Sequence, residues 1–335
     1  MDYPKVSVAI LNFNGKAHLE TCIDSISRTN YANFEILLVD NGSSDGSVEY
    51  VKGFYPEVKL IQNSQNLGTA AGYNCGIVNS EGKYVAIMNN DIEVDPDWLI
   101  ECIKVAEEDN RIAVCDSKYM NFYHRKRFDT VSAGGRLIDM FGNVFTRGRG
   151  EEDKGKFDTV TEVFVGLTLF RRNALVEAGI FDEVFFYGSE EIDLCWRLKL
   201  KGYKVFYVPK SKIYHKISQS VTEKRRFAPG FYFHTKKNRL QMLVKNHSLA
   251  SLFLAMPVVF FEYMGYLAFW AATKDPEYFM ETLRAMLWVL LNFRSVWVKH
   301  ENIQGSRKVS QDEIRKTMVS YCGDMVQFSS TLKKK

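Results

Sequence analysis

One short segment carries side chains suited to binding a metal ion. The apolar run 84–88 ends at Asn89, Asn90 and Asp91. In an α/β protein, a buried strand that ends in a carboxylate presents it at the sheet edge where ligands bind. Mg²⁺ and Mn²⁺ prefer oxygen ligands of this kind and bridge them to a nucleotide diphosphate. An ordinary polar turn has the same composition, so this segment alone supports a turn and a metal site equally.

Asp40 ends another apolar run and opens a sequence that must turn tightly, Asp-Asn-Gly-Ser-Ser-Asp-Gly over 40–46. A carboxylate in this place can accept a hydrogen bond from a ribose hydroxyl or a base imide. For Ser43 and Asp45 we favour a turn and a helix cap. Asp40 is therefore the candidate nucleoside ligand.

The stretch 66–74 contains Asn66, Gly68 and Asn74 among small residues. Small residues let backbone amides approach a phosphate at a helix N-terminus, but this stretch matches no standard phosphate loop. The chain contains neither G-x-G-x-x-G nor G-x-x-x-x-G-K-[ST], which disfavours dehydrogenases and P-loop enzymes.

Four charged side chains share one predicted helix: Glu190, Glu191, Asp193 and Arg197. Positions 190, 193 and 197 lie on one helix face, which predicts a structural ion network. Glu191 points elsewhere, and a carboxylate outside that network, beside an aromatic cluster, is a reasonable general base. Downstream, His215 closes a short strand; a lone histidine is more often structural, so its spacing alone disfavours a metal ligand.

A sheet must position these side chains, and the first 120 residues alternate β-branched runs with amphipathic stretches. The expected strands cover 6–11, 34–39, 58–61, 83–88 and 112–116, and the expected helices cover 18–27, 47–54, 69–78 and 97–108. This alternation predicts β/α units and a largely parallel sheet. Further on, the glycine-rich, basic stretch 122–156 predicts a mobile loop or hairpin over the site. The elements expected after it are strands over 160–170, 204–208 and 212–215 and helices over 173–178 and 189–201.

The C-terminal part is unusually apolar. Residues 249–272 contain a single charge, Glu262, with Pro257 near the middle, and are long enough to span a bilayer. Residues 279–298 are interrupted by three charges, which suits an in-plane amphipathic helix. Interfacial or re-entrant helices are the favoured interpretation; a transmembrane hairpin and a buried dimer core remain as alternatives.

Composition narrows the class of protein. At 335 residues, one large α/β domain with an appended segment is expected, and we place the domains at 1–225 and 226–335. The net charge of +4 is too mild to indicate nucleic acid. The six cysteines include no C-x-x-C pair, and the first strand begins near the N-terminus, so we expect a cytoplasmic location.

Taken in order, these motifs resemble family 2 glycosyltransferases of the rhamnosyltransferase-like branch. The resemblance covers about residues 5–245 and is carried by 6–15, 39–46, 66–68 with Asn74, 88–91, 190–197 and 214–215. It implies the GT-A nucleotide-diphospho-sugar transferase fold, an α/β fold with a mostly parallel central sheet, here followed by a C-terminal apolar helical extension.

The resemblance also implies roles for single residues. The implied donor-binding residues are Asn12, Asn14, Asp40, Asn66, Gly68, Asn74, Asn89 and Asn90. Asp91 matches the last acid of the D-x-D metal motif, and His215 matches a histidine that completes the shell of Mg²⁺ or Mn²⁺ in some members. Glu191 matches the catalytic base. Asn89 replaces the first acid of D-x-D, and Glu191 stands where Asp is commoner, which makes Glu190 a competitor for the role of base.

The implied function is inverting, metal-dependent transfer of a sugar, rhamnose or another hexose, from a UDP- or dTDP-sugar. The implied acceptor is a lipid-linked glycan or polysaccharide of the cell surface, reached from the inner face of the membrane, with a homodimer as one possible assembly. The alternatives are a catalytically silent sugar-nucleotide-binding membrane subunit and a nucleotidyltransferase. A nucleotidyltransferase would normally carry a basic glycine-rich loop near its first strand, and residues 12–15 are not one.

Overall fold

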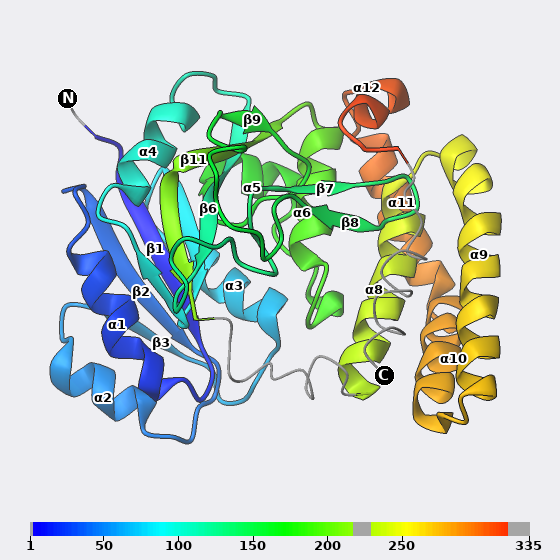
Figure 1. The fold of residues 1–335 in the computed structure, drawn as a ribbon, viewed down its shortest axis with the longest axis horizontal. Coiled ribbons are helices and arrows are strands. Elements are labelled where there is room, and N and C mark those ends of the chain that lie inside the picture. Colours follow the sequence, from blue (N-terminus) through cyan, green and yellow to red (C-terminus); the bar gives the residue numbers. More distant parts are fainter. Residues whose placement is uncertain (1–2, 217–228, 321–335) are drawn as a thin grey trace.

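A mixed, mostly parallel sheet forms the centre of the molecule (Figure 1). The computed structural model describes residues 3–216 and 229–320. The main sheet has the order β3-β2-β1-β4-β10-β6-β11-β5, and β9 pairs with β11. Its strands are β1 (Val6–Asn12), β2 (Phe34–Asp40), β3 (Lys59–Gln62), β4 (Tyr84–Asn89), β5 (Ile92–Val94), β6 (Ile112–Asn121), β9 (Thr161–Glu162), β10 (Leu169–Arg171) and β11 (Lys204–His215).

The strands that lead to the predicted site are parallel neighbours. β1 pairs in parallel with both β2 and β4, in a register that places Asn12 opposite Asp40 and Leu11 opposite Asn89. The carboxyl ends of these three strands therefore meet at one edge of the sheet, as the β/α pattern predicted. β10 and β5 run antiparallel to their neighbours, so the sheet is not uniformly parallel.

Helices cover both faces of the sheet and create two apolar cores. Alternate residues of a strand point to opposite faces, and in β4 Tyr84, Ala86 and Met88 enter one core while Val85 and Ile87 enter the other. The helices of this part are α1 (Lys16–Ser27), α2 (Ser47–Phe54), α3 (Thr69–Val78), α4 (Trp98–Ala106), α5 (Arg172–Ala178), the 3₁₀ turn η1 (Glu183–Phe185) and α6 (Glu190–Leu200).

For the stretch 122–156 we expected a mobile loop or a hairpin. The structure contains a β-hairpin there, formed by β7 (Arg136–Ile138) and β8 (Val144–Thr146). Two other expectations were wrong in detail. The strands expected over 204–208 and 212–215 are one strand, β11, with a register shift between Val208 and Lys212. The single strand expected over 160–170 is divided into β9 and β10, because the amides of Val163 and Phe164 bond to different partners, Val205 and Arg136.

The C-terminal helices gather at one end of the molecule, with α9 and α10 as an antiparallel pair on the outside (Figure 1). They are α8 (Pro229–Asn246), α9 (Leu249–Ala272), α10 (Pro276–Leu291), α11 (Phe293–Gly305) and α12 (Gln311–Lys316). α9 is long and apolar enough to cross a membrane, judged by length and composition. The second apolar stretch is not one helix, since α10 and α11 meet at Asn292. The expected domain boundary at 225/226 lies outside the described residues.

Candidate functional site

Three predicted donor-binding residues meet at the carboxyl edge of the sheet. Asn12 donates to Asp40 through Nδ2 (2.9 Å), and Asn90 Nδ2 donates to Asn12 Oδ1 (2.5 Å). Asp40 also accepts from the backbone amide of Ser43 (2.9 Å). A β-carbon on Gly15 would lie 1.8 Å from Asn90 Nδ2, so only glycine allows this close approach. The strand ends thus form one connected group of amides and a carboxylate.

Asn14, Asn66 and Gly68 shape the loops around that group. Asn14 Oδ1 accepts from the amide of Ser44 (2.8 Å), which ties the first two loops together. Asn66 Oδ1 accepts from the amide of Gly68 (2.9 Å). Gly68 has a φ of 85°, and a β-carbon there would lie 2.5 Å from the carbonyl oxygen of Phe186. Position 68 therefore requires glycine, because the loop of residues 66–69 packs closely there against the segment before α6.

Asn74 has a different environment from the other predicted donor ligands. Its Nδ2 donates to the carbonyl of Phe181 (2.9 Å) and to Glu183 (3.0 Å), and its Oδ1 accepts from the amide of Phe181 (3.0 Å). It lines a surface pocket together with Asp182 and Lys245. Because both ends of its amide bind the segment before α6, Asn74 braces that segment, and its role in donor binding stays a prediction.

Asp91 and His215 lie next to each other across β5 and β11. His215 Nε2 is 3.2 Å from Asp91 Oδ2, and His215 Nδ1 is 3.2 Å from Asp129 Oδ2. Burial lowers the pKa of His215, but hydrogen bonds and charge from Asp129 and Asp91 raise it to about 10. Burial raises the pKa of Asp91, but the hydrogen bond and the charge of His215 outweigh burial, so the net shift of the Asp91 pKa is downward. The imidazole is thus a cation held between two carboxylates.

This pair fits a divalent cation that also binds a diphosphate. Within the described chain, the buried Oδ1 of Asp91 has no hydrogen-bond partner. Residues 3–216 and 229–320 hold no cluster of three or more His, Cys, Asp or Glu side chains suited to a metal ion. Asp91 and a deprotonated His215 would therefore supply two ligands, and phosphate oxygens and water would supply the rest. Asp129, which sequence analysis missed, orients the imidazole from the other side.

The two glutamates at the start of α6 are in different states. Glu190 is buried, and in the described structure its Oε2 lacks a hydrogen-bond partner. Burial first, and then the charge of Glu191, raise the pKa of Glu190 well above its usual range. Glu191 Oε1 lies 2.6 Å from Nη1 of Arg136, a buried residue of β7. The pair therefore combines a buried acid with a raised pKa and a carboxylate that is ion-paired to Arg136.

The predicted ion network on α6 is only partly present. Arg197 Nε binds Asp193 Oδ2 (2.9 Å), as its spacing indicated, and Lys245 Nζ adds a contact to Asp193 Oδ1 (2.9 Å). Glu190 makes no ion pair with described residues, because its side chain is turned into the protein. Glu191 is not isolated either, since Arg136 binds it.

Tyr73 lies near both the Asp91–His215 pair and the two glutamates. Its hydroxyl donates to Asn89 Oδ1 (2.7 Å) at the end of β4. Burial, followed by charges that include those of Glu190, Glu191 and Asp91, holds the pKa of the Tyr73 phenol well above its ordinary value. The two groups of acids therefore face the same buried phenol from different elements, and together they define a single site.

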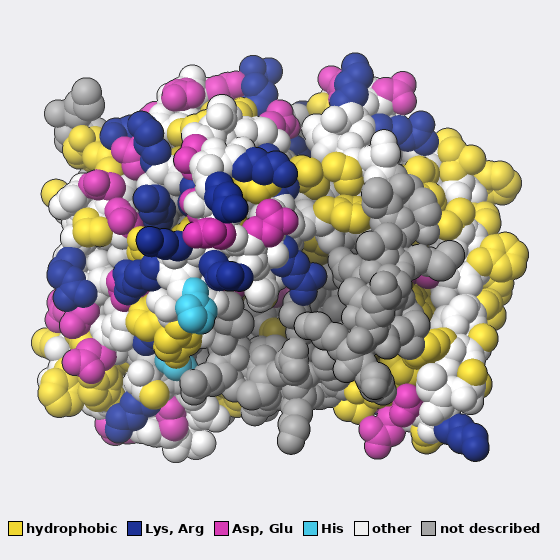
Figure 2. All heavy atoms as spheres, in the orientation of Figure 1, with side chains coloured by type: hydrophobic (Ala, Val, Ile, Leu, Met, Phe, Trp, Pro, Cys, Tyr) yellow, Lys and Arg dark blue, Asp and Glu magenta, His cyan; other side chains and the backbone are white. Residues whose placement is uncertain are grey.

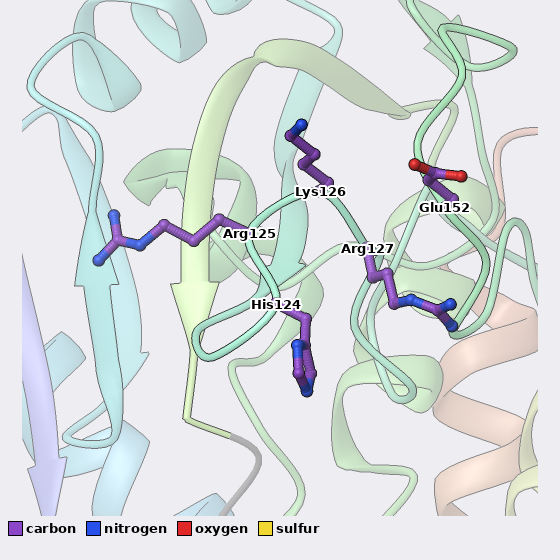
Figure 3. A pocket seen from close by; sticks show the side chains of 5 residues that line it. All are labelled: His124, Arg125, Lys126, Arg127 and Glu152. Carbon is purple, nitrogen blue, oxygen red and sulfur yellow. The ribbon is translucent and has the colours of Figure 1, made fainter.

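A basic loop, residues 122–127, lies beside His215. The backbone amide of Phe122, at its start, donates to the carbonyl oxygen of His215 (2.9 Å). Figure 3 shows that His124, Arg125 and Arg127 of this loop point in different directions. Arg125 is committed to Glu93, with both carboxylate oxygens within 2.9 Å of Nη2. Figure 2 shows further Lys and Arg side chains on this face of the molecule. The loop forms a basic rim whose side chains do not converge on one point.

The chain is an α/β protein with acids, amides and a histidine at the carboxyl edge of its sheet, which is where proteins of this class bind their ligands. The model of glycosyl transferase family 2 matches residues 7–179, just over half of the chain, and the chain belongs to this family. The poly-beta-1,6-N-acetyl-D-glucosamine synthase of Staphylococcus aureus (strain COL) is 24% identical over 214 residues, which are 59% of this chain and 46% of that protein. The chain spans less than half of the length of curated relatives such as this one.

Two solved structures have a similar fold. GalNAc-T7 with UDP, GalNAc and Mn²⁺ aligns with a TM-score of 0.53 and 18% identity, over 64% of this chain and 43% of its own. The mannosyltransferase PcManGT from Pyrobaculum calidifontis, in complex with GDP-Man and Mn²⁺, aligns with a TM-score of 0.51 and 16% identity, over 94% of this chain and 87% of its own. At these identities the likeness shows the fold alone, which is the GT-A fold. The rhamnosyltransferase-like branch stays a prediction.

Proposed function

We propose that this chain transfers a sugar from a nucleotide-diphospho-sugar to an acceptor hydroxyl with inversion at the anomeric carbon. The observation that carries this proposal is the meeting of two groups around Tyr73: the Asp91–His215 pair, with its unpartnered carboxylate oxygen, and the Glu190–Glu191 pair. The Asp91–His215 pair suits a cation that also binds a diphosphate, and the Glu190–Glu191 pair suits proton transfer.

The two glutamates divide the acid–base work. Glu191 forms an ion pair with Arg136 and is partly accessible, so it accepts the proton of the acceptor hydroxyl as that oxygen attacks the sugar. Glu190 keeps its proton, which limits the negative charge next to Glu191. A single displacement of this kind inverts the anomeric centre.

Asp91 and His215 are proposed to hold Mg²⁺ or Mn²⁺. When bound, the cation neutralises charge on the leaving nucleoside diphosphate. Asn12, Asp40 and Asn90 offer amide and carboxylate groups to the nucleoside and the diphosphate from the adjacent strand ends. We propose a UDP- or dTDP-sugar as the donor; the presence of UDP or GDP-Man with Mn²⁺ in proteins of the same fold supports this class of ligand.

The outer face of α9 supports a position at the membrane surface. Every exposed residue of α9 is apolar or glycine, including Phe253 (80% exposed) and Phe261 (72% exposed). Its one charge, Glu262, is turned inward onto Arg239 of α8. Apolar side chains also cover the outer edge of the molecule in Figure 2. We propose that this face lies in the interface of the inner leaflet, where the acceptor would be a lipid-linked or surface glycan.

The proposal is tested by incubating the purified protein with a panel of nucleotide-sugars and Mn²⁺ or Mg²⁺. We expect release of a nucleoside diphosphate from at least one donor, by hydrolysis or transfer. In a second assay, the protein is supplied with a sugar phosphate and a nucleoside triphosphate. Release of pyrophosphate from these substrates would identify a nucleotidyltransferase. Binding of donors without any turnover would identify a catalytically silent subunit.

A further inference from the structure

The segment 181–189, directly before α6, has an unfavourable backbone conformation. Phe186 and Ser189 have positive φ angles of 58° and 69°, although neither is glycine. Residues other than glycine rarely adopt positive φ angles, so contacts with neighbouring elements must hold the segment in this conformation. On one side, the carbonyl of Phe186 accepts from the amide of Thr69 (2.6 Å) at the start of α3. Glu190 and Glu191 follow immediately, so the segment fixes where the acids lie.

Asn238 of α8 holds the same segment from the other side. Its Nδ2 donates to the carbonyl oxygens of Phe185 (3.0 Å), Tyr187 (2.9 Å) and Gly188 (2.6 Å). The side chain is fully buried, and its Oδ1 accepts from Gln241 Nε2 (2.9 Å), which fixes the orientation of the amide. One amide thus gathers three carbonyls of a strained turn, and no aliphatic side chain could replace it.

Further contacts from α8 act on the ends of the segment. Lys237 Nζ donates to the carbonyl of Val184 (2.8 Å), and Lys245 Nζ binds Asp182 (2.6 Å). The residue after Asn238, Arg239, forms a two-point ion pair with Glu262 of α9, with both distances at 2.8 Å. α8 therefore joins the catalytic segment to the apolar helix through neighbouring side chains.

We propose that Asn238 is a positioning residue, which holds 185–188 so that Glu190 and Glu191 enter the site in the correct orientation. This inference rests on the proposed function for the role of the two glutamates. It also makes α8 part of the catalytic unit, although the sequence placed residues 226–335 in a separate domain. Asn238 is fully buried, so we expect its removal to act on turnover through the geometry of the acids.

The test compares Asn238→Ala and Asn238→Gln with Val259→Ala, a variant of a buried side chain on α9 that lies outside the segment. For Asn238→Ala we expect kcat to fall at least tenfold, while the Kd for UDP with Mn²⁺ stays within twofold of the wild-type value. We also expect faster hydrogen exchange of the amides of 184–190. Asn238→Gln keeps the donating amide and should recover part of the turnover. Val259→Ala should keep both wild-type kcat and wild-type exchange at 184–190.

Unchanged exchange at 184–190 in Asn238→Ala would overturn the inference, whatever the activity. So would equal losses of kcat in Asn238→Ala and Val259→Ala, since a general loss of stability would explain both. Failure of the wild-type protein to turn over any nucleotide-sugar would instead contradict the proposed function. The exchange measurement separates these failures, because it needs no catalysis.

Discussion

Arg136 and Glu191 form a buried ion pair across the site, with Nη1 of the arginine 2.6 Å from Oε1 of the glutamate. The arginine comes from the β7–β8 hairpin and the glutamate from the first turn of α6. The hairpin is therefore more than a cover over the site, because it supplies the counter-ion of the proposed base.

Breaking this pair from one side should be costly. For Arg136→Met we expect a loss of up to about 3 kcal/mol in the free energy of unfolding, because a partly buried carboxylate remains without its counter-ion. Adding Glu191→Gln should restore part of that loss. Urea unfolding of the two single variants and the double variant measures the coupling between them. Lys104→Met, which removes an exposed pair with Glu101, is the control and should cost at most about 1 kcal/mol. Additive losses from Arg136→Met and Glu191→Gln would contradict the pairing.

Glu190 should make the protein less stable as the pH rises. Its pKa in the folded state lies above its ordinary value of 4.5, so the unfolded chain releases this proton at lower pH than the native protein does. Above pH 4.5 this one group should lower the free energy of unfolding by up to about 1.4 kcal/mol per pH unit, until the native side chain also ionises. Glutamine resembles a protonated glutamate and cannot ionise, so Glu190→Gln should make the free energy of unfolding depend less on pH in this range. An identical pH profile for the variant would show that Glu190 is already ionised in the native protein.

Asp91 should contribute more to metal binding than His215 does. Removal of the carboxylate charge in Asp91→Asn should weaken Mn²⁺ binding in the presence of UDP by at least about 100-fold, and His215→Ala by about tenfold. Calorimetry with Mn²⁺ and UDP gives both values. His124→Ala on the nearby basic rim is the control and should bind Mn²⁺ like the wild type. Equal Mn²⁺ affinity in Asp91→Asn and the wild type would remove this residue from the metal site.

The apolar face of α9 should bind lipid. Phe261→Glu places a charge on that face, so co-flotation with anionic vesicles should fall at least fivefold, with unchanged turnover of a soluble donor. Val176→Glu, at an exposed apolar position of the catalytic part, is the matched control and should float like the wild type. If Phe261→Glu instead converts a dimer into a monomer and leaves flotation unchanged, the face is an interface between two copies of the chain.

The sequence predicted the elements best where local patterns determine structure. Strands with β-branched runs and the polar residues at their ends gave the correct sheet edge, including the approach of Asn12 to Asp40. Asp129, Arg136 and Asn238 were missed, because their roles depend on partners far along the chain. Arg136, for example, is 55 residues from Glu191. The helix spacing that grouped Glu190 with Asp193 and Arg197 could not show that Glu190 is buried and forms no ion pair with the residues that the structure describes.

The spacing argument for His215 was weak, and its neighbours in space decide its role. It ends β11, and antiparallel pairing with β5 places it beside Asp91, the residue directly before β5. That pairing could not be predicted from β/α alternation, which favours parallel neighbours. Asn74 shows the reverse case: a motif position with a clear implied role is used by the fold to brace the segment before α6.

The assignment of Glu191 as the base is the central claim, and Glu191→Gln tests it most directly. The measurement is the rate of nucleoside diphosphate release from the best donor of the nucleotide-sugar panel with Mn²⁺, together with the Kd for UDP and Mn²⁺. We predict a fall in turnover of at least about 1,000-fold, a Kd within about twofold of the wild-type value, and substantial activity in Glu190→Gln. Full turnover in Glu191→Gln, or loss of activity only in Glu190→Gln, would contradict the account.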